Sequence, residues 1–484
     1  MVNQSDAGSS ALEAPTFGGR MPAGSGDMAI ETHGIKPIPE DNRYGTPRRL
    51  FTVWFAPQLT MTGVFTGSLA IVFGLGFWLG LLAMVIGTVL GSLPVAYLST
   101  WGPRTGTGQL PASRMAFGGT VVLPAVVQWL SSIAWDGLVG LFGGEALAAL
   151  LHTPFWVGVV IVLALQGIVG IIGYELIHRV EAVMTVVLIV TFAVLTIKLL
   201  SGHQVVTAPA VHHADLAGAF VLEVTVALSL AISWASYASD YSRYLPASTP
   251  RKPVFWYSLG GIVLGYVCIQ AIGIAGAKAL GAETAEGVRS VMGGGFLGGL
   301  ALVVIALASV GSNVMNDYSG SLALQTVGVR VRRPVSALVV TVIAFFLILW
   351  MHGGDTASRF QDVLLFVGYW IPAFVAIVTI DWLYRLHGRN SVNPAQEITV
   401  RADAIVAVIA FVVAFGAAVP FMNTSIIVGP VAKAWHGADV AYYVNFLVAA
   451  IIYGGYRAWR HRAAVSKQVH GEIGTAPLPG RPIV

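Results

Sequence analysis

The residues of this sequence best suited to chemistry lie inside apolar segments, and the most regular set falls between positions 308 and 319. Serine and asparagine recur there at spacings of three and four residues, which places them on one helix face: Ser309, Ser312, Asn313, Asn316 and Ser319. An amide offers two donors and an acceptor, and in hydrocarbon it needs partners. The stripe therefore faces a ligand, water or another helix. Hydrogen bonding between helices is the plainer alternative.

A second set adds an indole and a carboxylate at helical spacing: Gln128, Ser131, Ser132, Trp135 and Asp136. A charged side chain at the centre of a membrane helix costs roughly 2.5–3.5 kcal/mol on insertion scales. Asp136 is therefore a functional candidate by default. An indole at this depth more often packs than binds, but an indole beside a carboxylate is harder to dismiss.

A third set shares one face between positions 229 and 240, and Trp234 adjoins its Ser233: Ser229, Ser233, Ser236, Tyr237 and Asp240. Aromatic rings from the second and third sets could sandwich a flat ring, whose edge the asparagines of the first set would read. This combination suits a planar, neutral, hydrogen-bonding heterocycle. It suits an amino acid less well, because a carboxylate would find only backbone N–H groups as partners.

The elements that position these residues are predicted to be membrane helices. Of 484 residues, 56% are hydrophobic and 10% are charged, whereas soluble domains carry roughly 25% charged residues. The net charge of +4 does not indicate nucleic-acid binding, since the basic residues lie in short loops. Runs of about 20 apolar residues or more, long enough to span a bilayer, predict twelve spans at 51–75, 77–99, 119–150, 155–175, 180–200, 216–239, 254–280, 292–325, 334–351, 361–384, 402–421 and 438–459.

The distribution of Lys and Arg predicts how these spans are oriented. With the N-terminus in the cytoplasm, most basic residues near the membrane fall on the inner side, as the positive-inside rule requires. The outer side receives Lys198, Lys278, Arg289, Arg359 and Lys433. We therefore expect a multi-pass protein of the cell (cytoplasmic) membrane, with both termini cytoplasmic.

Two of the predicted spans are interrupted. Pro57 and Gln58 break the first span, and the sixth is polar through its inner half. Interrupted helices five spans apart indicate an inverted-repeat transporter with its site at the breaks. We expect a disordered cytoplasmic tail over 1–45, a ten-helix transport core over 46–384, two additional helices over 385–460 and a cytoplasmic tail over 461–484.

No catalytic motif competes with this interpretation. The single cysteine, Cys268, excludes an internal disulfide and a cysteine-based metal cluster. His-Glu-x-x-His, a nucleophile elbow and a phosphate-binding glycine loop are all missing. The sequence therefore predicts a protein that is not an enzyme and has no resident cofactor.

Several short motifs resemble those of the purine-cytosine permease family within the nucleobase–cation symporters. They are the segment from Glu31 to Pro39 with Arg48-Arg49, the loop motifs Gly108-Gln109, Ser113-Arg114 and Phe117-Gly118, the stretch from Ser236 to Pro246, and the stretch from Ser312 to Asn316. The resemblance covers roughly residues 31 to 460. It implies a five-plus-five inverted repeat with two further helices, and alternating access.

The resemblance also implies binding roles for individual residues. Trp135 matches the family's stacking aromatic, Asn313 and Asn316 match its amide readers, and Gln58 matches its polar residue of the first span. The second stacking position falls near Ser233 and Trp234, and Ser132 adjoins the site. Sodium-coupled relatives would bind the ion at positions that correspond to Trp54, Pro57, Ala308, Gly311 and Ser312.

The sequence does not decide whether the coupling ion is sodium or a proton. A hard cation wants five or six oxygens, and Gly311 stands where a hydroxyl would be expected. The family that the sequence resembles also includes proton-coupled members. In this sequence, Asp136 and Asp317 are the residues that could carry a proton.

The sequence thus predicts a secondary active transporter that imports cytosine or a purine together with sodium or protons. The alternative keeps the fold and changes the cargo to allantoin, a hydantoin or a pyridine vitamin precursor. The expected partners are this small molecule and membrane lipid, without nucleic acid or an obligate protein partner.

Overall fold

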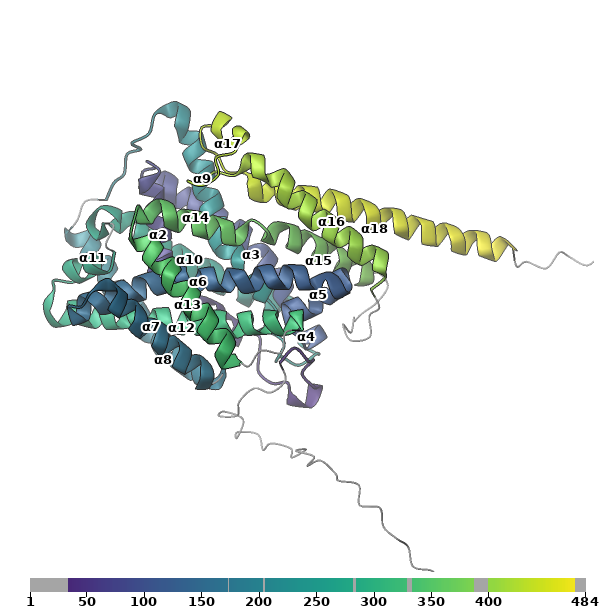
Figure 1. The fold of residues 1–484 in the computed structure, drawn as a ribbon, viewed down its shortest axis with the longest axis horizontal. Helices are drawn as coiled ribbons and strands as arrows, with labels where there is room; N and C mark the ends of the chain where they lie inside the picture. The colour runs from purple at the N-terminus through teal and green to yellow at the C-terminus, as the bar shows by residue number, and fades with distance from the viewer. Residues whose placement is uncertain are drawn as a thin grey trace, which may run out of the picture.

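In the computed structural model, the described part of the chain is a bundle of helices (Figure 1). The structure describes residues 34–172, 174–202, 205–281, 284–328, 333–386 and 399–474. Within these ranges the only β-type pairing is one isolated bridge between Asn423 and Val428. The expected all-helical membrane fold is therefore confirmed.

The long helices follow the predicted spans closely. They are α1 (Arg49–Phe55), η3 (Ala56–Gln58) and α2 (Met61–Val72), then α3 (Phe77–Ser99), α6 (Val122–Leu151), α7 (Phe155–Ile172), α8 (Tyr174–Gly202), α9 (His213–Ile232) with η5 (Ser233–Tyr237), α10 (Arg251–Leu280), α12 (Gly295–Val327), α13 (Arg333–His352), α14 (Thr356–Gly368), α15 (Ile371–Leu386), α16 (Arg401–Ala418) and α18 (Ala441–Gly474). Short helices connect them: η2 (Glu40–Asn42), α4 (Gly102–Thr105), α5 (Gln109–Phe117), η4 (Gly118–Val121), α11 (Thr284–Val291), η6 (Val419–Phe421) and α17 (Pro430–Ala434).

Length and hydropathy single out part of this set as membrane-spanning. Within the described residues, 7 helices are long and apolar enough to cross a membrane, and a bent pair made of α1–η3 and α2 gives up to 8. Shorter apolar helices cover Phe155–Ile168, Val186–Gly202 and Leu338–His352. The count of twelve spans stays a prediction.

The first span is broken where the sequence indicated. After Pro57 and Gln58 the backbone leaves the helix at Leu59 (ψ 65°) and is extended at Thr60. The two half-helices meet at a bend of 60°. Proline removes a backbone donor and clashes with the preceding turn, which accounts for the break.

The tenth span, Thr356–Leu386, has a local irregularity that the sequence did not indicate. Its halves α14 and α15 meet at Tyr369 and Trp370. Side chains of α18 satisfy backbone groups there: the Tyr442 hydroxyl donates to the Leu365 carbonyl (2.9 Å), and Asn445 Oδ1 accepts from the Ala373 N–H (2.6 Å). Backbone groups at this irregularity thus have tertiary partners that lie more than 70 residues away in the chain.

Helix packing follows the pattern of an inverted repeat of five. The first span packs along the seventh (α2 on α10), and the sixth packs along the second (α9 on α3). Exchanging the two halves of the repeat turns one of these pairs into the other. The third and eighth spans, α6 and α12, form the most extensive contact of the bundle and pair with each other under the same exchange.

Glycines allow close backbone approach at both equivalent contacts. A Cβ on Gly273 of α10 would lie 1.8 Å from the Val64 carbonyl oxygen of α2. A Cβ on Gly87 of α3 would lie 2.2 Å from the Val224 carbonyl oxygen of α9. Small residues at such contacts are typical of membrane helices that pack tightly.

We expect Gly273→Ala to destabilise the protein, because the new methyl group meets backbone and not a flexible side chain. Overpacking of this kind costs about 1–3 kcal/mol. The thermal unfolding midpoint of the detergent-purified protein should fall. Gly416→Ala on α16 is the control, since no heavy atom lies within 4 Å of its added carbon. Equal midpoints for both variants would contradict the close packing of α2 on α10.

The expected N-terminal tail is shorter than predicted. Residues 34–45, predicted to be disordered, are attached to the helices at several points although most of them are exposed. Ile38 is buried and its N–H donates to the Gly106 carbonyl (2.8 Å), while the Tyr44 N–H donates to Tyr244 (2.7 Å). The buried Ile38 side chain and these two backbone hydrogen bonds fix the segment to the helices. The rest of that predicted tail, 1–33, lies outside the described residues.

The C-terminal prediction also changes in detail. Helix α18 continues past residue 460 to Gly474, and residues 475–484 lie outside the described ranges, as do 387–398. Figure 1 shows α16 and α18 side by side along one edge of the bundle, with the end of α18 projecting beyond it. Arg457 of α18 forms an ion pair with the buried Asp381 of α15, which ties these helices to the core.

Candidate functional site

The polar stripe of α12 faces α6, and both of its asparagines are engaged there. Asn316 Nδ2 donates to the Ser132 carbonyl (2.7 Å) and to Asp136 Oδ1 (2.7 Å). Asn313 Nδ2 donates to the Asp136 carbonyl (3.3 Å). All four residues are buried, so the two helices share a hydrogen-bonded interior at this level.

Gln166 of α7 joins this interior and connects the two candidate proton carriers. Its Nε2 donates to Asp136 Oδ2 (2.9 Å) and Asp317 Oδ2 (3.3 Å), and its Oε1 accepts from Asn313 Nδ2 (2.9 Å). We call Asp136, Gln166, Asn313, Asn316 and Asp317 the amide–carboxyl cluster. Gln166 was not among the residues predicted for the site. The available signal was a lone amide in the apolar run 155–175, which in hydrocarbon requires a partner.

The cluster extends to the end of the sixth span. The Tyr237 hydroxyl in η5 donates to Asn316 Oδ1 (3.0 Å) and accepts a hydrogen bond from Gln128 Nε2 of α6. Ser236 in turn donates to Gln128 Oε1. Four helical segments, α6, α7, α12 and η5, thus meet in one buried network. Gln128 and Tyr237 were singled out as polar positions but were not assigned to the site.

One atom of the cluster is left without a partner. Asn313 Oδ1 is buried and accepts no hydrogen bond from the described residues. Buried acceptors are nearly always paired. This oxygen is therefore the place in the cluster at which an N–H group of a ligand would be stabilised most.

The predicted stacking tryptophans have different surroundings. Trp135 is half-buried and lies seven residues after Gln128, on the same side of α6 that faces η5. Trp234 is buried: its Nε1 donates to the Tyr266 hydroxyl (2.7 Å), and its ring meets Trp54 edge-on (centroids 5.7 Å apart, 82°). Trp135 thus retains ring surface outside the protein interior, whereas Trp234 is fixed by its neighbours.

The side chains of Ser233 and Gln58 both donate hydrogen bonds to backbone carbonyls three or four residues earlier in the chain. The Ser233 hydroxyl donates to the Leu230 carbonyl (2.8 Å) of α9. Gln58 Nε2 donates to the Trp54 carbonyl (3.0 Å), four residues earlier in the broken helix. A ligand would have to displace these local bonds to reach either side chain.

The positions implied for sodium lie where η3 packs against α12. Ala308 and Ser312 are buried on α12, and no heavy atom lies within 4 Å of the position that a Cβ would occupy on Gly311. On the η3 side, the Trp54 carbonyl already accepts the Gln58 amide, and Pro57 lies between the two. One carbonyl of the set is therefore shared with a side chain, and Gly311 adds no side-chain oxygen to the five or six that a hard cation prefers.

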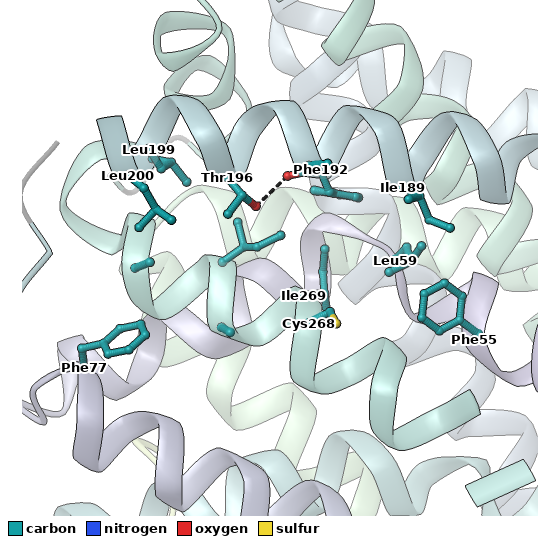
Figure 2. A pocket seen from close by; sticks show the side chains of 14 residues that line it. Phe55, Leu59, Phe77, Ile189, Phe192, Thr196, Leu199, Leu200, Cys268 and Ile269 are labelled. Carbon is teal, nitrogen blue, oxygen red and sulfur yellow. Dashed lines mark hydrogen bonds between the residues drawn. The ribbon is translucent and has the colours of Figure 1, made fainter. Parts of the chain in front are cut away.

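A separate groove of about 410 Å³ opens between α8 and α10 beside the first-span break. Figure 2 shows Phe55, Phe192, Leu199 and Cys268 among the side chains that line it. Its one hydroxyl, on Thr196, already donates to the Phe192 carbonyl (2.7 Å). The rest of the lining is apolar apart from the Cys268 thiol, so the groove has few groups that could bind the polar edge of a heterocycle.

Comparison with known proteins identifies the family. A family model described as a permease for cytosine/purines, uracil, thiamine and allantoin matches residues 37–445. The chain belongs to this permease family. It is a membrane transporter and not an enzyme.

Individual relatives are similar to the permease over most of its length. A putative purine-cytosine permease, YxlA, of Bacillus subtilis is 26% identical over 443 residues, covering 88% of this chain and 95% of the relative. The purine-cytosine permease fcyB of Emericella nidulans is 24% identical, covering 88% of each. The vitamin B6 transporter TPN1 of Saccharomyces cerevisiae is 26% identical, covering 72% of the permease and 65% of the relative.

Solved structures share its fold. The inward-facing conformation of Mhp1 superposes with a TM-score of 0.70 at 17% identity, covering 93% of the permease and 99% of Mhp1. Mhp1, a nucleobase-cation-symport-1 family transporter, in a closed conformation with bromovinylhydantoin bound, gives 0.69 at 15% identity, covering 90% and 97%. At this identity the likeness shows the fold alone.

Proposed function

We propose that the permease imports a nucleobase, cytosine or a purine, by alternating access coupled to a cation gradient. The observation that carries the proposal is the unpartnered Asn313 Oδ1 in a buried cluster of amides where α12 meets α6. A nucleobase offers a ring face for stacking and N–H groups on its edge. Asn313 Oδ1 would accept one of these N–H groups, and Trp135 would stack on the ring.

The names of the relatives support a nucleobase as the substrate, and they also support a second class of substrate. Two of them are named as purine-cytosine permeases, one is named as a vitamin B6 transporter, and the Mhp1 structure holds a hydantoin. Allantoin, a hydantoin or a pyridine vitamin precursor is therefore the second candidate. All of them contain a small nitrogen heterocycle with a hydrogen-bonding edge.

A panel of ligands separates these candidates without requiring transport. A ligand that binds the folded state raises the unfolding midpoint according to its concentration and Kd. We expect cytosine, adenine, hypoxanthine or guanine to stabilise the purified permease more than allantoin, a hydantoin or pyridoxine. Stabilisation by pyridoxine alone would assign the cargo to the alternative.

For the coupling ion, the proposal favours protons over sodium. At the positions implied for sodium, the Trp54 carbonyl already accepts a hydrogen bond from Gln58, and Gly311 contributes no hydroxyl. Asp136 and Asp317, by contrast, are joined through one amide nitrogen inside the bundle.

The proposed location is the cell membrane with both termini in the cytoplasm. Figure 1 shows α11 and α4, which precede the eighth and third spans, near opposite ends of the bundle, as alternation of loops requires. A reporter fused after Val484 should be active only on the cytoplasmic side. Labelling of a C-terminal tag by an impermeant reagent on intact cells would overturn this orientation.

A further inference from the structure

The amide–carboxyl cluster leaves Asn316 with no donor to offer a substrate. Both of its N–H groups are in use, one at the Ser132 carbonyl and one at Asp136 Oδ1, and its oxygen accepts from Tyr237. An amide has two donors. Asn316 can therefore read a ligand only after one of these bonds is released.

Asp136 is the partner whose hold on Asn316 depends on its charge. As a carboxylate it accepts from Asn316 at Oδ1 and from Gln166 at Oδ2. Hydrogen bonds to an ionised acceptor are roughly twice as strong as those between neutral groups. A proton on Asp136 turns one of its oxygens into a donor and weakens the other as an acceptor.

Asp317 makes the uptake of a proton favourable. The Gln166 nitrogen reaches one oxygen of each carboxyl group, so the two acids are neighbours across a single –NH₂. Two ionised carboxylates at such short range inside a membrane repel each other. One proton held between them removes a charge and leaves the pair hydrogen-bonded.

Among the described residues, the other groups around Asp136 carry no positive charge. From α12 the cluster receives Asn313, Asn316 and Asp317, and from α7 it receives Gln166. From η5 the titratable Tyr237 reaches it through Asn316. The adjoining turn of α6 meets α13 through apolar side chains: Leu347, Ile348 and Met351.

We propose that a proton bound by the Asp136–Asp317 pair releases the Asn316 amide, which then binds the edge of the substrate. Substrate and proton binding are thereby coupled, and the coupling is reciprocal, so bound substrate favours the protonated pair. Gln166 is a positioning residue that holds the two acids together. This inference rests on the proposed function, because it assumes a substrate edge at Asn316.

The test is the pH dependence of substrate binding by the purified permease without sodium. With one coupled proton, the Kd for the preferred base should rise up to tenfold per pH unit above the range in which the pair loses its proton. When the nucleobase is added to the permease in a weakly buffered solution, the permease should take up a proton as it binds. This uptake is measured as a rise in the pH of the solution. Asp136→Asn should abolish both effects, whereas Asp215→Asn, at an exposed carboxylate, should retain them.

The outcomes separate this inference from the proposed function. If no base binds at any pH, with or without sodium, the proposed function fails. If a base binds with the same Kd from pH 5 to pH 8, or needs sodium instead, only the proton switch is overturned. Should Asp136→Asn fail to fold, Asp317→Asn serves in its place, since removing either acid removes the shared proton.

Discussion

Replacing Asn316 with alanine is expected to abolish substrate uptake while the permease remains folded in the membrane. The amide makes three hydrogen bonds, to Ser132, Asp136 and Tyr237, and it joins α12 to both α6 and η5. Leaving a buried polar group without its partner costs about 1–3 kcal/mol. A substrate edge that loses this amide should therefore bind roughly 5- to 150-fold more weakly.

The measurement is the Kd for the preferred base beside the unfolding midpoint of the same variant. Ser321→Ala on the same helix is the matched control, because its hydroxyl bonds only to its own turn at Tyr318 (2.7 Å). Loss of binding at a retained midpoint supports the assigned role. Unchanged binding with a lowered midpoint would show that Asn316 only holds helices together.

Trp135→Ala should remove most substrate binding, and Trp135→Phe should retain part of it. The indole is half-buried and faces the side of α6 on which Gln128 meets η5. Stacking of a base on an aromatic ring is worth roughly 1–3 kcal/mol in other proteins. Phenylalanine keeps a smaller ring face, whereas alanine leaves that side of the base without contact.

Trp78 provides the control for this series, since it lies on α3 and its side chain is 68% exposed on the outside of the described bundle. Trp78→Ala should leave the Kd unchanged. A Trp135→Ala protein that binds and transports like the wild type would place the site elsewhere.

Sequence periodicity was sufficient to predict the helices and the helix faces that carry the candidate residues. Spacings of three and four residues placed Asn313 and Asn316 on one face of α12, and Pro57 marked the first-span break. These features are local, so they can be predicted from neighbouring residues. The family match then confirmed the transporter class.

Partners contributed by other helices could not be predicted in this way. Gln166 is one amide in an apolar run, and nothing in its neighbourhood indicates that it meets both Asp136 and Asp317. The contacts of Tyr442 and Asn445 of α18 with the junction of α14 and α15 are likewise not visible in the local sequence. Such contacts arise from helix packing over long separations, which periodicity does not encode. The same limit explains why the contacts of Trp234 with Trp54 and Tyr266 could not be predicted.

The central claim is that the permease concentrates a nucleobase with the energy of a cation gradient. Its most direct test is uptake of labelled cytosine and purines by proteoliposomes, with proton and sodium gradients imposed separately and choline replacing sodium. We expect accumulation above the external concentration under an inward proton gradient in choline, and its loss on adding a protonophore. Failure of every tested base to accumulate under either gradient, by liposomes that contain folded permease, would contradict the account.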